Sequence, residues 1–261
     1  MKTNRFWVAV LLLNITWAWA QPSRPYTREE DKMWAKRIWR IVDMREKFNH
    51  IYFYPIEQTE ERISLIDLIR LGIREGKITP YEPNFNGADW KGVMDAEKAL
   101  LVGSTEEYVR MNRPDPPYDE YDTVFYNELN NFNVLRFKVK EEWFFDKKRS
   151  VMDVKIVAIC PVLDVYDLDG ELKGFLDMFW IQYDEARAFF HQYKVYNPNN
   201  WAQRLTYDDS FKMHMFKSYI YKEDNVYERS IQDYLKGTDA LRESDEIEKQ
   251  LQDYEFDLWQ Y

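Results

Sequence analysis

The first strongly patterned segment of the chain follows Thr27. Thr27 and Glu30 have the spacing of a capping box, in which two side chains bond each other's backbone amides at a helix start. Apolar residues then recur at near-helical spacing, which predicts an amphipathic helix over residues 27–47. Its buried stripe would be Met33, Trp34, Ile38, Ile41 and Val42. Its outer surface would be basic, with Lys36, Arg37, Arg40 and Arg45.

Three shorter elements are predicted next. Residues 51–54 favour a short strand. Ser64 and Asp67 mark the start of a second helix, and Gly76 marks its end. The apolar face of this helix would be Leu65, Leu68, Ile69 and Ile73. Residues 78–81 then predict a short extended piece.

Turn-forming residues dominate the middle of the chain. Residues 84–92 predict a loop. Ser104 and Glu107 have the capping-box spacing again and predict a short helix that ends before Pro114. The proline-rich run 112–117 continues neither a helix nor a central strand. Composition does not change across this run, so we interpret it as a rigid loop inside one unit rather than as a domain linker.

Strand patterns open the second half. Residues 134–145 alternate imperfectly, and residues 151–165 are rich in β-branched side chains. Asp169 and Gly170 separate this run from the apolar run 175–183 and predict a hairpin turn. Helices are predicted over 183–193, 206–219 and the C-terminal part from 225. Together the elements predict an α+β fold, with a small antiparallel sheet, several packed helices and a helical C-terminus. We expect residues 21–261 to form a single domain.

The first twenty residues have the pattern of a cleavable signal peptide. Lys2 and Arg5 give a positive start, an apolar stretch follows, and Ala18–Ala20 match the small–x–small cleavage rule. The apolar stretch is shorter than the roughly 20 residues that span a bilayer. An uncleaved anchor or a buried helix is the alternative. Gln21 follows the cleavage site where a lipoprotein would have cysteine, so we expect an exported protein without a lipid anchor.

Charge and composition narrow the class of partner. Without the leader, 34 basic residues face 46 acidic residues, a formal net charge of −12. This balance argues against a nucleic-acid partner, because nucleic-acid binders usually present a basic domain or face. Aromatic residues make up 17% of the chain, whereas glycine contributes only 8 residues. Such a composition suits large ordered surfaces, and aromatic residues are enriched at binding surfaces, although most of them are expected in the core.

No catalytic constellation is recognisable in the sequence. Cys160 is the only cysteine and lies in an apolar run, so we expect a buried thiol and no disulfide within the chain. His50, His191 and His214 have no second metal-ligating residue at a useful spacing, and no G-x-S-x-G elbow or glycine-rich phosphate loop is present. We therefore expect no enzyme activity, no cofactor and no metal site.

Three other groups of residues have simple structural interpretations. Asp208 and Asp209 are expected at a helix start, where carboxylates are favoured by the helix dipole. The acidic residues before Gly170 resemble a calcium loop, but the ligand spacing fails and a hairpin is the better interpretation. Phe179, Trp180 and Tyr183 would suit stacking on a glycan, but they are expected in the core. Because these aromatic side chains could form a stacking surface, a glycan-binding protein remains an open alternative.

Several blocks of the sequence, in order, resemble the GldN/PorN family, periplasmic components of the type IX secretion and gliding-motility machinery of Bacteroidetes. Each block alone would be weak, but they extend over nearly the whole mature chain. The blocks are residues 33–47, 63–68, 72–79, 178–181, 185–187, 206–209, 216–220, 225–231 and 255–261.

The resemblance implies a structural role. Proteins of this family are soluble subunits that pair with an outer-membrane lipoprotein of the K type. The two build a ring of repeated subunits in the periplasm, against the inner face of the outer membrane. The family is also linked to the inner-membrane-anchored M component. It has no established catalytic residues, so none is expected here.

Contact regions are a separate hypothesis. Opposite charge would pair the basic outer face of the first predicted helix, with Lys36, Arg37 and Arg40, with the acidic C-terminal helix that carries Trp259. The alternative is that both are solvated faces. For the protein as a whole, the other classes left open are a periplasmic glycan or peptidoglycan binder and an enzyme with an unrecognised site.

Overall fold

The computed structural model describes most of the chain from Thr27 onwards. The described residues are 27–56, 58–59, 62–83, 90, 92–114, 116, 120–127, 129, 131–167, 169–196 and 204–258. The predicted leader and Trp259 lie outside these residues. In the part of the chain that the structure describes, no helix is long and apolar enough to cross a bilayer.

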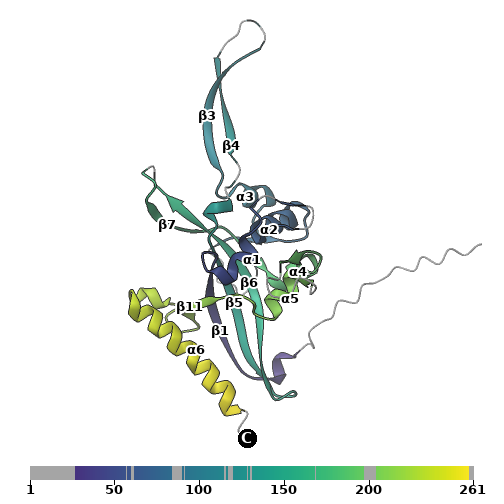
Figure 1. Cartoon of the computed structure of the whole chain (residues 1–261), viewed down its shortest axis with the longest axis vertical. Helices are drawn as coiled ribbons and strands as arrows, with labels where there is room; N and C mark the ends of the chain where they lie inside the picture. Colours follow the sequence, from purple (N-terminus) through teal and green to yellow (C-terminus); the bar gives the residue numbers. More distant parts are fainter. Residues whose placement is uncertain are drawn as a thin grey trace, which may run out of the picture.

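An antiparallel sheet of seven strands forms the centre of the protein (Figure 1). Its order is β11-β1-β5-β6-β8-β2, and β7 pairs with the last part of β6. The strands are β1 (Lys32–Asp43), β2 (Pro80–Tyr81), β5 (Arg136–Asp146), β6 (Val151–Tyr166), β7 (Leu172–Asp177), β8 (Trp180–Gln182) and β11 (Ser218–Glu223). Two further pairs join β3 (Thr105–Asn112) to β4 (Glu120–Asn127) and β9 (Lys194–Val195) to β10 (Leu205–Thr206).

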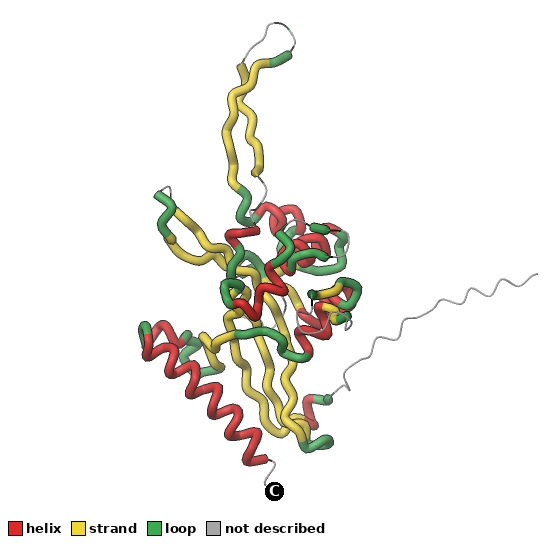
Figure 2. The backbone as a smooth tube through the Cα atoms, viewed as in Figure 1, coloured by secondary structure: helices red, strands yellow, loops and turns green. Residues whose placement is uncertain are grey.

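Helices cover one face of this sheet (Figure 2). They are α1 (His50–Phe53), α2 (Leu65–Arg74), α3 (Ala96–Leu101), α4 (Tyr183–Phe190), α5 (Tyr207–Lys212) and α6 (Thr238–Leu258). Val139 and Ile159 of the sheet join the main core with Leu68, Phe190 and Phe211 of the helices, and all five side chains are buried. The predicted α+β class, with an antiparallel sheet and a helical C-terminus, is confirmed.

The helix predicted over residues 27–47 is wrong. Only a 3-10 turn (Glu29–Asp31) precedes β1, which pairs with β5 on one side and with β11 on the other. Residues 38–42 of this central strand are all buried, so the apolar stripe that suggested a helix is a strand covered on both faces. The strands that pair with β1 are distant in sequence, so the spacing of apolar residues within β1 does not indicate them.

Three other local predictions are also wrong. Residues 51–54 are largely the short helix α1 rather than a strand. The segment after Ser104 forms β3 instead of a helix, and it pairs with β4 in a hairpin that projects from the body of the protein (Figure 1). Helix α5 ends at Lys212 instead of residue 219, because residues 218–223 pair with β1. Strand pairing overrides local helical patterns in two of these cases.

Of the four helix caps predicted, those at Ser64 and Thr206 are confirmed, whereas Thr27 and Ser104 lead into strands. The Ser64 hydroxyl accepts a hydrogen bond from the Asp67 backbone amide at 3.3 Å, and Gly76 follows α2 with a positive φ of 66°. Thr206 and Asp209 cap α5 reciprocally. The predicted turn before β7 also forms, with Gly170 at φ 77°. The expected loop over residues 84–92 lies mostly outside the described residues. In the proline-rich run, Asn112 is the last residue of β3, and residues 113, 114 and 116 are in neither a helix nor a strand, as expected for a loop. The single-domain prediction stays a prediction.

Helix α6 packs against the edge of the sheet formed by β11 and its neighbour β1. Its Ile247 and Leu251 pack on Ile38 of β1 and Ile220 of β11 in a second apolar cluster. The hydroxyl of Ser244 accepts a hydrogen bond from the Ile220 backbone amide at 2.9 Å, inside the protein. That amide belongs to the edge strand β11, so α6 covers part of an edge that would otherwise be open to another strand.

Candidate docking groove and the polar cluster beside it

A groove of about 1050 Å³ opens beside α1, at the end of the sheet where β1 finishes. It is lined by Glu46, Lys47, Phe48, His50, Ile51, Tyr54, Pro55, Ile56, Arg62, Tyr196, Met215 and Lys217. Three of its aromatic side chains are exposed: Phe48 by 51%, Tyr54 by 50% and Tyr196 by 44%. Exposed aromatic residues gathered in a concave surface are typical of a binding site.

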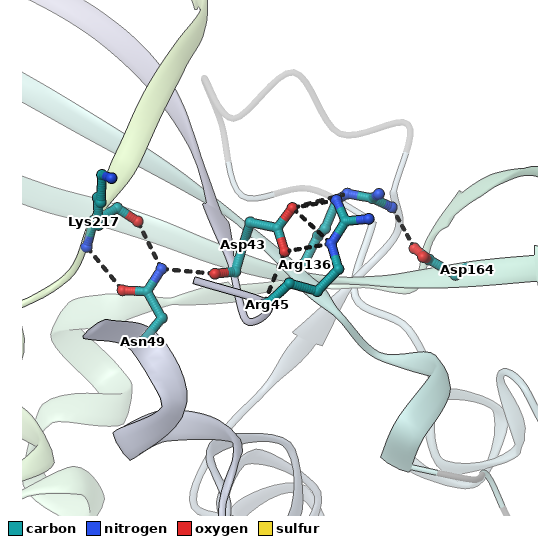
Figure 3. Close-up of polar contacts among 6 residues, drawn as sticks. All are labelled: Asp43, Arg45, Asn49, Arg136, Asp164 and Lys217. Atoms are coloured by element: carbon teal, nitrogen blue, oxygen red, sulfur yellow. Dashed lines mark hydrogen bonds and ion pairs between the residues drawn. The ribbon is translucent and has the colours of Figure 1, made fainter. Parts of the chain in front are cut away.

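Asn49 fixes the position of α1 beside the groove (Figure 3). Its side-chain Nδ2 donates to the carbonyl oxygens of Asp43 at 2.8 Å and Lys217 at 2.7 Å. Its Oδ1 accepts from the Lys217 backbone amide at 2.8 Å. Asn49 is fully buried, and these bonds satisfy both its donor and its acceptor groups. The end of β1, the start of α1 and the segment entering β11 are thereby held together.

Tyr52 holds the other side of α1. Its hydroxyl donates to the Met215 carbonyl oxygen at 2.9 Å and lies 2.6 Å from the Ser210 hydroxyl oxygen. Its ring stacks on Phe211, with centroids 5.3 Å apart. Burial raises the pKa of Tyr52 well above its ordinary value, so the hydroxyl keeps its proton. The groove is therefore built on a fixed base rather than on a free loop.

The rim of the groove is basic. Lys47, Arg62 and Lys217 line it together with one acidic residue, Glu46, in a chain whose formal net charge is −10. Lys217 Nζ lies 3.5 Å from a Glu46 carboxylate oxygen. The guanidinium of Arg62 lies over the ring of Tyr196, 4.7 Å from the centroid. The groove thus combines aromatic faces with positive charge, a surface suited to an acidic partner that carries apolar side chains.

A cluster of charged side chains joins this region to the base of β7 (Figure 3). Asp43 accepts hydrogen bonds from Arg45, with Nε at 2.9 Å, and lies 3.8 Å from Arg136 Nε. Arg136 Nη1 donates to Asp164 at 2.5 Å, and its guanidinium lies 4.1 Å from the ring centroid of Phe175. These groups satisfy one another, so we interpret the cluster as structural.

The two carboxylates of this cluster titrate in opposite directions. Burial alone raises the pKa of Asp43, but hydrogen bonds and charge from Arg45, with the charge of Arg136, outweigh burial and lower it. For Asp164 burial dominates, and its pKa is raised in spite of Arg136 and Arg45. The environment therefore favours a charged Asp43 more strongly than a charged Asp164.

The three basic residues proposed from the sequence lie on β1, not on a helix. Arg40 is buried, and its Nε lies 3.0 Å from Glu141 while its Nη1 lies 3.3 Å from Glu248 of α6. Lys36 Nζ pairs with Glu223 at 2.6 Å. Arg37 is exposed. The opposite charges of the basic segment and the C-terminal helix therefore meet within one chain, through Arg40 and Glu248.

The residues whose side chains could act in catalysis, glycan stacking or metal binding have structural roles. Cys160 is fully buried, and burial raises the pKa of its thiol. Phe179, Trp180 and Tyr183 are core residues, as expected. Within the described chain, one group has the spacing of a metal site: His191, Asp208 and Asp209.

The carboxylates of that group already have partners. Asp208 accepts hydrogen bonds from the Tyr183 hydroxyl at 2.9 Å and from Arg187 Nε at 3.1 Å, and it pairs with Lys212. Asp209 takes part in the capping box of α5. We therefore interpret both as helix-start residues, in agreement with the sequence prediction.

The groove was not predictable from the sequence. Its lining comes from four separate stretches of chain, which only the fold brings together. One local signal was available: Phe48, Tyr52, Phe53 and Tyr54 concentrate aromatic residues in a short segment before Pro55. Tyr52 lies in the core and Tyr54 lines the groove, and the spacing of aromatic residues along the sequence does not show which of them is buried.

Comparison with known proteins gives one family. The model of a family described as "Gliding motility associated protein GldN" matches residues 27–260. A search of curated proteins found no match.

Proposed function

The chain belongs to the gliding-motility-associated GldN family, and we propose that it is a non-catalytic structural subunit of the periplasmic ring of the type IX secretion system. The observation that carries the proposal is the extent of the match. It runs from residue 27 to residue 260, so it includes the sheet, the helices and the projecting hairpin together. The proposed process is protein secretion, and in gliding species also motility.

The surface of the protein supports an assembly role. Large apolar side chains are exposed in the groove and also along the β6–β7 hairpin. The hairpin residues are Tyr166, Leu172, Phe175 and Leu176, each between 45% and 56% exposed. Exposed apolar surface of this kind marks contacts with other proteins. A ring subunit needs at least two different contact surfaces for identical neighbours, because head-to-tail contacts are heterologous.

The partners follow from the family resemblance. We propose a K-type outer-membrane lipoprotein, identical copies of this chain and the M component, with no nucleic acid. The predicted leader would place the subunit in the periplasm, and the lipoprotein would hold it against the inner face of the outer membrane. The pairing of the acidic and basic residues within the chain, and the burial of Cys160, favour a structural over a catalytic role.

Genetic removal tests the proposed function. Deleting the chain from its bacterium is expected to abolish export through the type IX system, measured as the proteins released into the medium, and re-expression is expected to restore it. A version without residues 2–20 is the matched control, because it should accumulate inside the cell and fail to restore export. Unchanged export in the deletion strain contradicts the proposal.

A glycan- or peptidoglycan-binding protein is the second candidate. The exposed rings of Phe48, Tyr54 and Tyr196 favour it, because aromatic faces offer apolar stacking surfaces with polar groups at their edges. Sedimentation with purified cell-wall sacculi separates the two functions. A glycan binder pellets with the sacculi and loses this property when Tyr54 and Tyr196 are changed to alanine, whereas a ring subunit stays in the supernatant.

A further inference from the structure

The groove and the C-terminal segment of the chain have matching chemistry. The groove presents exposed aromatic faces and a rim with three cations and one carboxylate. Residues 253–261 carry three carboxylates, no basic residue and several apolar side chains. The carboxylates are Asp253, Glu255 and Asp257, and the large apolar residues after Tyr254 are Phe256, Leu258, Trp259 and Tyr261.

The contacts of α6 with the sheet reach Tyr254, near the start of this segment. Leu251 is buried in the cluster beneath α6, and the ring of Tyr254 packs at a tilt against Trp34, with ring centroids 4.8 Å apart. Phe256, two residues on, is 66% exposed, and Asp257 is exposed as well. An exposed phenylalanine flanked by carboxylates, at the end of a helix that is otherwise docked, is available to a partner.

The segment does not reach the groove of its own chain. Tyr254 lies against Trp34, near the start of β1. The groove starts at Glu46, beyond the other end of the strand at Asp43. Strand β1 separates Trp34 from Asp43 by about 30 Å at the usual rise per residue. Trp259 lies five residues after Tyr254 and reaches at most ~18 Å from it in a fully extended chain.

The arrangement in space agrees with this estimate. The end of α6 and helix α1 lie toward opposite ends of the sheet (Figure 1). The groove is therefore open to the C-terminal segment of another molecule, while the described end of α6 in the same molecule lies too far away for Trp259 to reach it. A contact between the C-terminal segment of one copy (residues 253–261, the tail) and the groove of the next uses two different surfaces, so it repeats from copy to copy. It closes into a ring when the rotation between neighbouring copies divides a full turn evenly.

We propose that residues 253–261 of one copy dock in the groove of a second copy. The aromatic side chains after Tyr254 would pack against Phe48, Tyr54 and Tyr196, and the carboxylates of the segment would face Lys47, Arg62 and Lys217. This inference rests on the proposed ring function and names the surface that joins identical subunits. Apolar contact supplies the affinity, and the opposite charges set the partner and the direction.

Charge reversal on the purified mature protein tests the contact. Lys47→Glu and Asp257→Lys are each expected to weaken self-association by about tenfold or more, measured by sedimentation velocity, because each places like charges together in the contact. The double variant is expected to recover most of the wild-type association. Lys47 and Asp257 are exposed, so both variants should melt at the wild-type temperature. Lys173→Glu, on exposed β7, is the matched control and should associate like the wild type.

A mixing experiment gives a second, independent readout. A protein with Tyr54→Asp has an intact tail, and a protein with Phe256→Asp has an intact groove. Each alone is expected to be monomeric, whereas an equimolar mixture should form a dimer with one intact contact. Unaltered self-association of both single variants, or no dimer in a mixture of folded variants, overturns the inference. If the lipoprotein is still recovered in a very large particle with those variants, only the tail–groove contact fails and the proposed function stands.

Discussion

The side chain of Asn49 bonds the main chain of Lys217 in both directions, donating to its carbonyl oxygen at 2.7 Å and accepting from its amide nitrogen at 2.8 Å. The buried amide thus imitates a strand partner for one residue, at the point where the chain enters β11. A third bond, to the carbonyl oxygen of Asp43 at 2.8 Å, ties the same amide to the end of β1. One side chain therefore links three segments that border the groove.

Replacing Asn49 with alanine is expected to be strongly destabilising. The change removes the partner of two Lys217 main-chain groups and of the Asp43 carbonyl oxygen, all in part-buried hydrogen bonds, and each group left unpaired away from water costs about 1–3 kcal/mol. We expect the free energy of unfolding, measured in urea, to fall by about 2–4 kcal/mol. Asn112→Ala, at an exposed position of β3, is the control and should change it by less than about 0.5 kcal/mol. Equal effects of the two variants contradict the assigned role of Asn49.

Replacing Arg40 should destabilise the protein far more than replacing Arg37, although the two residues are only three positions apart on β1. Arg40 pairs with Glu141, which is fully buried, and its removal leaves this carboxylate with only the Trp143 indole N–H at 3.0 Å and His214 Nε2 at 3.4 Å. Arg40→Ala is expected to lower the free energy of unfolding by about 3–5 kcal/mol. Arg37→Ala, at an exposed position, should cost less than about 0.5 kcal/mol.

The titration of Glu141 agrees with this assignment. Burial alone raises the pKa of Glu141, but the hydrogen bond and charge of His214, with the charge of Arg40, outweigh burial and lower it. Glu141 is therefore favoured as a carboxylate inside the protein by the side chains that surround it, among which Arg40 carries a permanent positive charge. If Arg40→Ala proves as mild as Arg37→Ala, the buried ion pair is not important for stability.

Lys140 makes stability depend on pH in the alkaline range. Burial, reinforced by the charge of Arg37, lowers the pKa of Lys140 from 10.5 to about 8. Between these values the unfolded chain binds more protons than the folded protein, so the contribution of Lys140 to stability improves as pH rises. Below about pH 8 both states are protonated and the full cost of burying the charge remains.

Comparison with Lys140→Met isolates this effect from other titrating groups. The free energy of unfolding of the wild type, relative to the variant, should rise by about 1–2 kcal/mol between pH 7 and pH 10. A difference that is constant with pH contradicts a lowered pKa for Lys140.

Cys160 should be unreactive in the folded protein. It is fully buried, and burial raises the pKa of its thiol, so almost no thiolate is available for reaction. A chromogenic disulfide reagent at pH 8 is expected to label one thiol per chain in denaturant and to label the native protein only as fast as it unfolds. Rapid labelling of the native protein contradicts the burial of Cys160.

Local chemistry was predictable from the sequence only in part, because the capping boxes read at Thr27 and Ser104 lead into strands. The caps at Ser64 and Thr206 and the turn at Gly170 depend on a few neighbouring residues, and all three were predicted correctly. Strand β1 was not, because Arg40 pairs with Val139 of β5 and with Ile220 of β11, both far away in the sequence. An apolar spacing of three and four residues fits a helix and also a strand that is buried on both faces.

In the candidate site, too, features set by neighbouring residues were predictable, whereas features set by residues distant in the sequence were not. The exposed Arg37 and the acidic C-terminal helix were visible as charged patterns, but the burial of Arg40 depends on Glu141 and Glu248, which only the tertiary fold brings near. The groove required Tyr54, Tyr196 and Lys217 to meet, and no spacing rule relates these positions. Whether the charged residues of β1 contact another chain stays a prediction.

An affinity pull-down tests the central claim most directly. The tagged mature protein would be recovered from membranes of its own bacterium after solubilisation in mild detergent, and the mass and composition of the recovered particle would be measured. The account predicts stoichiometric recovery of an outer-membrane lipoprotein in a very large particle that contains many copies of this chain. Recovery of the protein as a clean monomer without a lipoprotein contradicts the account.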